Sequence, residues 1–101
     1  MPTIAQIETL LASEPDDAFL NYSLAMLLAK ERRRAEAIAR FDHLLELDPN
    51  YIAGWFQKGI YLAGLGETAA ARATLERGIE RAGAIGDAHA RGEMAEFLAT
   101  L

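Results

Sequence analysis

Hydrophobic residues recur every three to four positions in six segments of the chain, which is the spacing of one face of an α-helix. In the first segment the apolar positions are Ile4, Ile7, Leu10 and Leu11. This segment ends at Pro15, because a proline disfavours helix in the residue before it. The same periodicity predicts helices over residues 18–30, 35–47, 52–63, 68–81 and 88–101. We find no strand alternation and expect an all-α protein.

Polar and glycine residues mark the turns between these helices. Asp16 and Asp17 precede the second helix, where a side-chain oxygen can accept from its unpaired amides. Residues 48–50 form a turn cluster, and residues 83–86 are predicted to be a loop. Gly64 and Gly66 are predicted to end the fourth helix in left-handed or extended geometry.

The sequence also matches itself at an offset of 34 residues, which is the separation of Pro15 and Pro49. Under this shift large apolar residues fall on large ones. Small residues also meet, as Ala25 meets Gly59. Because helix backbones approach closely only where a side chain is small, these positions are expected to be contacts between paired helices.

The residues of the two copies resemble the tetratricopeptide repeat (TPR) family. One copy carries the pattern as Trp55, Gly59, Leu62, Leu65, Gly66, Ala71, Leu75 and Gly78, with Gly83 in the place of the family's proline. The other carries it as Leu24, Ala25, Leu28, Ala37, Phe41, Leu44 and Pro49, with Asn21 where the second copy has Trp55. The resemblance implies a right-handed superhelical array of about six helices in antiparallel hairpins, a TPR solenoid.

This resemblance also implies how the single domain is organised. Residues 1–15 would form the second half of an earlier repeat, residues 18–51 and 52–85 two full repeats, and residues 86–101 a capping helix. The capping helix would present its apolar face through Met94, Phe97, Leu98 and Leu101.

Composition excludes several classes of function. The net charge of -5 and the sequence pI near 4.9 oppose binding to nucleic acid or to an anionic membrane surface. No apolar run approaches the roughly 18 residues that a membrane span needs. The chain has no cysteine and no recognisable secretory signal, so we expect a cytoplasmic protein without disulfides.

Candidate chemistry is sparse. The glycine pattern of Gly64, Gly66 and Ala69 resembles a dinucleotide fingerprint, but that motif needs a preceding strand, and a turn between helices is the favoured interpretation. His89 and Glu93 share a helix face at metal-ligand spacing, yet no third ligand is indicated. Arg32, Arg33 and Arg34 are interpreted as favourable charges at a helix end. We therefore expect no enzyme, no cofactor and no metal site.

The TPR resemblance implies where a partner would bind, because in that family the first helix of each repeat lines a concave groove. Transferred to this chain, the groove residues are Phe19, Tyr22, Ser23, Met26, Lys30, Phe56, Gln57, Ile60 and Arg91. Chaperone-binding members clamp a terminal carboxylate with basic and amide side chains, and only Arg91 would serve that purpose here. An apolar groove with a polar fringe remains, suited to a hydrophobic peptide or an amphipathic helix.

Two hypotheses follow for the stripe of Phe19, Tyr22 and Met26. Such stripes usually belong to a core, but the same helix has a separate core face in Leu24, Leu27 and Leu28. The first hypothesis is an adaptor that binds a segment of a partner protein without catalysis. The alternative is a structural module that self-associates, for example as a homodimer, through the groove or the terminal helices.

Overall fold

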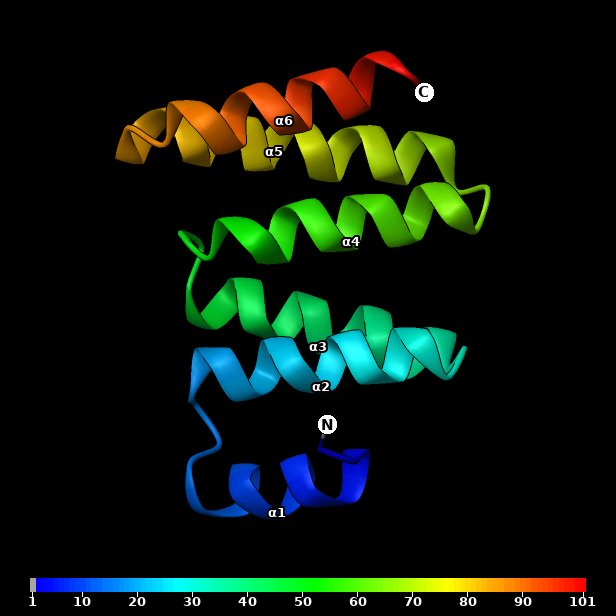
Figure 1. Cartoon of the computed structure of the whole chain (residues 1–101), viewed down its shortest axis with the longest axis vertical. Coiled ribbons are helices and arrows are strands. Elements are labelled where there is room, and N and C mark those ends of the chain that lie inside the picture. The colour runs from blue at the N-terminus through cyan, green and yellow to red at the C-terminus, as the bar shows by residue number, and fades with distance from the viewer. Residues whose placement is uncertain (1) are drawn as a thin grey trace. The chain divides into compact units, whose positions relative to one another are not determined.

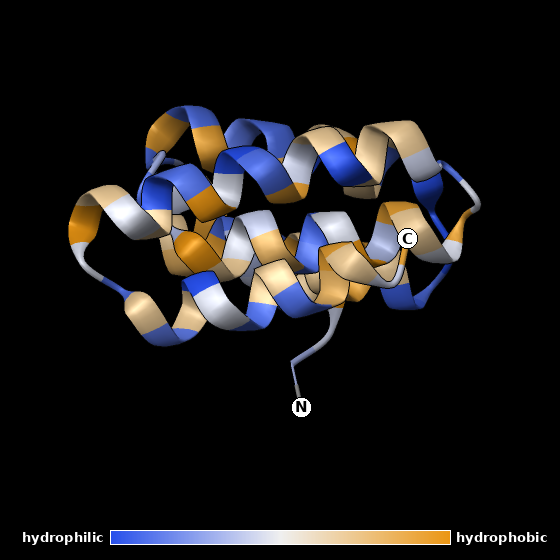
Figure 2. Cartoon of the chain, turned by 90° about the horizontal axis from the view of Figure 1, so that it is seen from above, coloured by the Kyte–Doolittle hydropathy of each residue, from blue (hydrophilic) through white to orange (hydrophobic). Residues whose placement is uncertain are grey.

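The protein is described by a computed structural model of residues 2–101, and this range contains six helices and no strand. The helices are α1 (Ile4–Ser13), α2 (Ala18–Lys30), α3 (Arg34–Leu47), α4 (Ile52–Gly64), α5 (Thr68–Ile85) and α6 (Ala88–Ala99) (Figure 1). The prediction of an all-α fold built from helix hairpins is confirmed. Hydrophobic and hydrophilic residues are interspersed along the helices (Figure 2).

The largest difference from prediction concerns the end of α5. Residues 83–86 were predicted to be a loop, and this is wrong because α5 continues to Ile85. Gly83 occupies the position of Pro49 in the preceding copy, and glycine keeps the amide that proline lacks. The helix ends one turn later at Gly86, whose φ of 78° is left-handed. There the amide of Asp87 donates to the carbonyl of Ala82 at 2.9 Å.

The turns after α2 and α4 have the same left-handed geometry. Arg32 has a φ of 60° and Gly66 a φ of 80°. In each turn the next amide reaches back five residues: Arg33 donates to Leu28 at 2.9 Å, and Glu67 donates to Leu62 at 3.0 Å. These bonds satisfy carbonyls that a helix end leaves unpaired. Gly64 is the last residue of α4, so the expectation for the two glycines holds for Gly66 alone.

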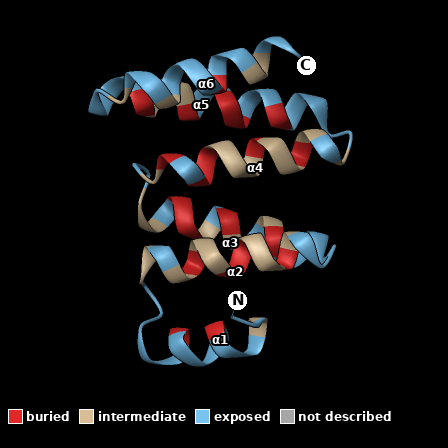
Figure 3. Cartoon of the chain, in the orientation of Figure 1, coloured by how far each residue is buried: buried red, intermediate tan, exposed pale blue. Residues whose placement is uncertain are grey.

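The chain divides into two compact units, Met1–Asp48 and Pro49–Leu101. In the first unit α2 and α3 form a hairpin, and α1 lies against α2. Its core consists of Ile7, Leu11, Leu24, Ala25, Leu28, Ala37, Phe41, Leu44 and Leu45 (Figure 3). Two sequence expectations need correction. Leu10 is 53% exposed, because the buried residues of α1 are Ile7 and Leu11, and Leu27 is only half-buried.

In the second unit α4 pairs with α5, and α6 packs on α5. The buried apolar residues are Ile52, Trp55, Leu62, Ala71, Leu75, Ala82 and Met94. Gly59 marks a close approach, as its small size predicted: a Cβ atom there would lie 2.6 Å from Leu75 Cδ2. The predicted apolar face of α6 is buried at Met94 and half-buried at Phe97, Leu98 and Leu101.

Candidate functional site

A largely apolar cavity lies along α2 and is also lined by residues of the N-terminal segment. It has a volume of about 550 Å³. Its lining residues are Pro2, Ile7, Phe19, Tyr22, Ser23, Met26, Leu27 and Lys30. All of them belong to the first unit. Five of the predicted groove residues, from Phe19 to Lys30, are thus brought together on one surface, which we call the α2 cavity.

The sequence positions these side chains through two features of α2. Phe19, Tyr22 and Met26 follow the spacing of one helix face, while Leu24 and Leu28 on another face are buried. The start of the helix is held by Asp17, whose Oδ1 accepts from the amide of Leu20 at 2.8 Å.

Buried Asn21 strengthens the attachment of this helix start. Its Nδ2 donates to the carbonyls of Pro15, at 3.0 Å, and of Asp17, at 2.8 Å. Its Oδ1 accepts from Arg40 of α3, also at 2.8 Å. The rotation of α2, and with it the direction of the cavity residues, is therefore supported by hydrogen bonds as well as by packing.

The exposure of the cavity side chains is graded. Phe19 at the rim is 64% exposed, Tyr22, Ser23, Met26 and Leu27 are half-buried, and Lys30 is exposed. Burial raises the pKa of Tyr22, so its phenol is neutral at physiological pH. Lys30 is therefore the charged group of the lining. A mostly apolar surface with one cation can bind apolar side chains.

The predicted residues on α4 belong to the second unit. Phe56, Gln57 and Ile60 are all half-buried. The ring of Phe56 packs edge-on against Phe97 of α6, with centroids 6.2 Å apart and an interplanar angle of 60°. Sequence reasoning placed Phe97 only on the capping face. The spacing of Phe97 from Met94 indicates that both share one helix face, but this spacing does not identify Phe56 as the ring that Phe97 contacts.

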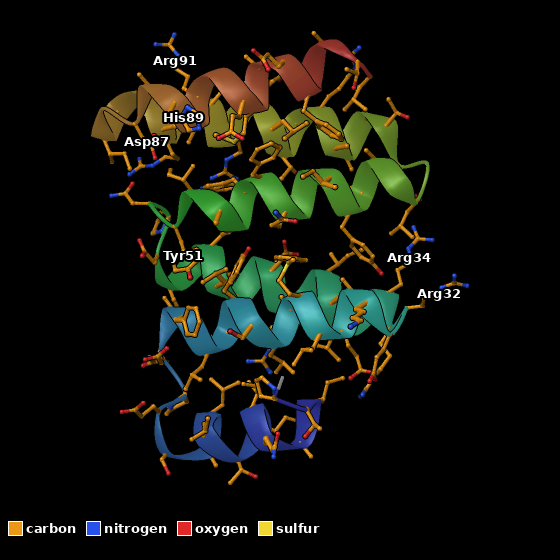
Figure 4. The ribbon with its side chains drawn as sticks, in the orientation of Figure 1. Arg32, Arg34, Tyr51, Asp87, His89 and Arg91 are labelled. Atoms are coloured by element: carbon orange, nitrogen blue, oxygen red, sulfur yellow. The ribbon has the colours of Figure 1, made fainter. Side chains whose placement is uncertain are left out.

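Arg91 does not join Phe56. It is exposed on α6, and a Cβ atom added to Gly83 of α5 would lie 3.8 Å from its Cδ. Figure 4 shows Arg91 extending from α6 on the side away from α4.

Sequence reasoning missed three residues of the α2 cavity. Pro2 and Ile7 come from the N-terminal segment, and Leu27 comes from α2 itself. Ile7 and Leu27 were assigned to the core on their apolar spacing alone. The only signal in the sequence was a stripe of apolar positions wide enough to contribute residues both to a core and to a cavity.

Two other cavities are more polar. One of about 390 Å³ in the first unit is lined by Glu8, Leu24, Leu28, Glu36, Ala39, Arg40 and His43. Two of its charged groups are already engaged: Arg40 binds Asn21, and Glu36 pairs with Arg33 at 2.7 Å. The other, of about 310 Å³, is in the second unit and is lined by Asn50, Tyr51, Ile52, Ala53, Ile85 and Asp87. Asn50 accepts a hydrogen bond from Arg81 Nε at 3.0 Å.

The His89 and Glu93 pair forms as the spacing predicts. Nε2 of His89 lies 2.8 Å from Oε1 of Glu93 on the exposed surface of α6. Within residues 2–101 no group of three or more side chains is arranged to hold a metal ion. In the same range, no helix is long and apolar enough to cross a membrane.

Comparison with known proteins gives consistent results over most of the chain. A family model described as "Tetratricopeptide repeat" matches residues 20–51. A TPR repeat-containing protein of Pseudomonas aeruginosa is 33% identical over 98 residues, which cover 97% of this chain and 93% of the relative.

Solved structures agree. A tetratricopeptide repeat domain protein from Salinibacter ruber has a TM-score of 0.79 at 30% identity, covering 85% of this chain and 87% of its own. The TPR2B domain of yeast Sti1, solved as a complex with pHsp70, has a TM-score of 0.86 at 23% identity. That match covers 95% of this chain and 77% of the yeast chain. At this identity the likeness to the yeast domain concerns the fold.

Proposed function

Because the chain belongs to the tetratricopeptide repeat family, we propose that it is a non-catalytic interaction module that binds an apolar segment of another protein in the α2 cavity. Proteins of this family are modules for protein–protein interaction, and the yeast Sti1 domain is solved in complex with pHsp70. The fold alone does not specify a ligand, so the proposal rests on the site.

The observation that carries the proposal is the combination of Tyr22 and Met26 in an open cavity. The core face of α2 is complete without them, because Leu24 and Leu28 are buried against the rest of the unit. Contiguous exposed apolar surface usually marks an interaction site. Tyrosine and methionine are also enriched in the centres of protein interfaces.

The charge of the lining favours a particular occupant. Lys30 is the only charged side chain among the lining residues. An ion pair with Lys30 favours a partner segment that carries a carboxylate beside its apolar residues. The 13 residues of α2 span about 20 Å, the length of about six residues of an extended peptide. We therefore propose a short segment of a partner protein rather than a small molecule.

The experiment uses fluorescent nine-residue peptides whose five central positions are drawn from leucine, isoleucine, phenylalanine and methionine, with one glutamate at an end. Binding is measured by fluorescence anisotropy. We expect micromolar binding by the best members, and at least a tenfold loss in a Tyr22→Ala/Met26→Ala variant whose far-UV circular dichroism is unchanged. Leu10→Ala and Ile85→Ala are matched controls, because they remove exposed apolar side chains outside the α2 cavity.

Two outcomes would overturn the proposal. Equal binding by the double variant and the wild type would place the peptide elsewhere. A wild-type mass that rises with concentration in sedimentation, together with a monomeric double variant and no peptide binding, would assign the cavity to self-association instead.

A further inference from the structure

The charges around α2 are separated along its length. From residue 1 to residue 29 the charged side chains are Glu8, Glu14, Asp16 and Asp17, with no lysine or arginine. Residues 30–34 then supply Lys30, Arg32, Arg33 and Arg34. Acidic residues therefore precede α2 along the chain and basic residues follow it, and Lys30 is the one of these charged residues that lines the α2 cavity.

At the positive end two cations remain available. Within the described residues 2–101, neither Lys30 nor Arg32 has an ion-pair partner. Arg33 instead pairs with Glu36 at 2.7 Å. Arg32 extends from the turn between α2 and α3, and Arg34 extends from the first residue of α3 (Figure 4). Lys30 lines the cavity, whereas Arg32 and the neighbouring carboxylate Glu31 are both exposed outside its lining.

At the negative end Asp17 is occupied as the helix cap. Glu14 and Asp16 are exposed, and neither has an ion-pair partner among residues 2–101. The dipole of α2 opposes this pattern, with about half a positive charge at the start of the helix and half a negative charge at its end. Glu14 and Asp16 at one end, and Lys30 and Arg32 at the other, carry full unit charges, compared with about half a charge at each end of the helix.

We propose that the α2 cavity selects a polarised peptide, with an acidic residue next to Lys30 and Arg32, an apolar centre over Tyr22 and Met26, and a basic residue next to Asp16. This inference rests on the function proposed above and adds the charge pattern and direction of the bound segment. The two ends are about 20 Å apart, which exceeds the Debye length of about 8 Å at physiological ionic strength. Each end therefore acts on its own part of the peptide.

The test compares four peptides with one shared apolar centre. The first has glutamates at one end and lysines at the other, the second glutamates at both ends, the third lysines at both ends, and the fourth serines at both ends. Because the peptide could run in either direction along α2, the first peptide is made in two versions, one with the glutamates at its N-terminal end and one with them at its C-terminal end. At 50 mM salt we expect the better polarised peptide to bind roughly threefold to tenfold more tightly than the others, the range for two exposed ion pairs. At 0.5 M salt the advantage should shrink.

A pair of variants tests the positive end. In the Lys30→Gln/Arg32→Gln variant the glutamates of the peptide no longer have cations to pair with. The polarised peptide should therefore lose its advantage in affinity over the peptide with lysines at both ends. Ala69→Glu/Ala73→Glu is the control: it changes the net charge by the same amount on exposed positions of α5 and should preserve the ranking.

The result separates the two proposals. If the serine peptide binds the wild type as tightly as the polarised peptides do, the charge inference is wrong while the proposed function stands. If no peptide binds more weakly to Tyr22→Ala/Met26→Ala than to the wild type, the proposed function itself fails.

Discussion

The indole Nε1 of Trp55 donates a hydrogen bond to the carbonyl of Pro49 at 2.8 Å. The equivalent positions in the preceding copy make the same connection, because Asn21 Nδ2 donates to the carbonyl of Pro15 at 3.0 Å. An aromatic ring and an amide thus have the same structural role, since each ties the start of a helix to the turn before it. Comparison of the two copies in the sequence shows that Asn21 stands in the place of Trp55, but it does not show that both make the same hydrogen bond.

Asn21→Ala should destabilise the protein by about 1–3 kcal/mol, because Asn21 is fully buried and the change removes its side-chain hydrogen bonds to the carbonyls of Pro15 and Asp17 and to Arg40. Urea unfolding followed by circular dichroism measures the change. Asn50→Ala is the matched control, since Asn50 is exposed where it accepts from Arg81, and it should cost at most about 1 kcal/mol. Equal costs for the two variants would contradict the structural role of Asn21.

A second replacement compensates for the size of Trp55. Gly78 occupies the position of Leu44 in the preceding copy, so the pair Trp55 and Gly78 stands where the other copy has Asn21 and Leu44. A Cβ atom at Gly78 would lie 2.6 Å from Trp55 Cβ and 2.8 Å from Met94 Sδ. The large residue in α4 thus requires a small one in α5. Arg77 covers the outer side of the ring, 4.8 Å from its centroid.

Gly78→Ala should therefore destabilise the protein by about 1–3 kcal/mol, the usual cost of overpacking, even though alanine favours helix by about 1 kcal/mol. The atom it meets is a Cβ, which cannot move without its backbone. Gly92→Ala is the control, because it is also helical but has no atom within 4 Å of the added methyl group, and it should raise stability. Thermal melting of both variants gives the comparison, and a Gly78→Ala protein as stable as wild type would refute the tight contact.

Much of the fold could be predicted because local signals agreed with the packing. The bounds of α2 follow from Asp17 as cap and from the apolar spacing, and both are as predicted. The end of α5 could not be predicted, since Gly83 permits either a loop or a continued helix, and the helix ends only at the left-handed Gly86.

The site was predictable in part for the same reason. The α2 stripe of Phe19, Tyr22 and Met26 is visible in the sequence. The contributions of Pro2 and Ile7 depend on where α1 packs, which no local pattern specifies. The ring contact between Phe56 and Phe97 likewise arises from packing between helices.

Arg32→Gly should stabilise the protein by about 1 kcal/mol, because a residue with a Cβ atom is strained in the left-handed region and glycine is not. The equivalent turn in the second copy already has Gly66 at this position. Gly66→Ala, which places a Cβ atom on the same geometry, should lower stability by a similar amount. We expect calorimetry to show a higher melting temperature for Arg32→Gly and a lower one for Gly66→Ala. Shifts of the same sign would exclude backbone strain at these positions as the explanation.

Alkaline titration tests the burial of Tyr22 in the α2 cavity. Because burial raises its pKa in the folded state above the ordinary value of about 10, the folded protein holds this phenol proton more tightly than the unfolded chain does. The resulting contribution to the free energy of unfolding is fully present below pH of about 10 and is lost as the pH rises through the raised pKa. Absorbance at 295 nm should therefore show a late phenolate component that Tyr22→Phe removes. Tyr61→Phe, the same exchange outside the cavity, should leave that component in place. A late component that persists in Tyr22→Phe would show that Tyr22 is not the desolvated phenol.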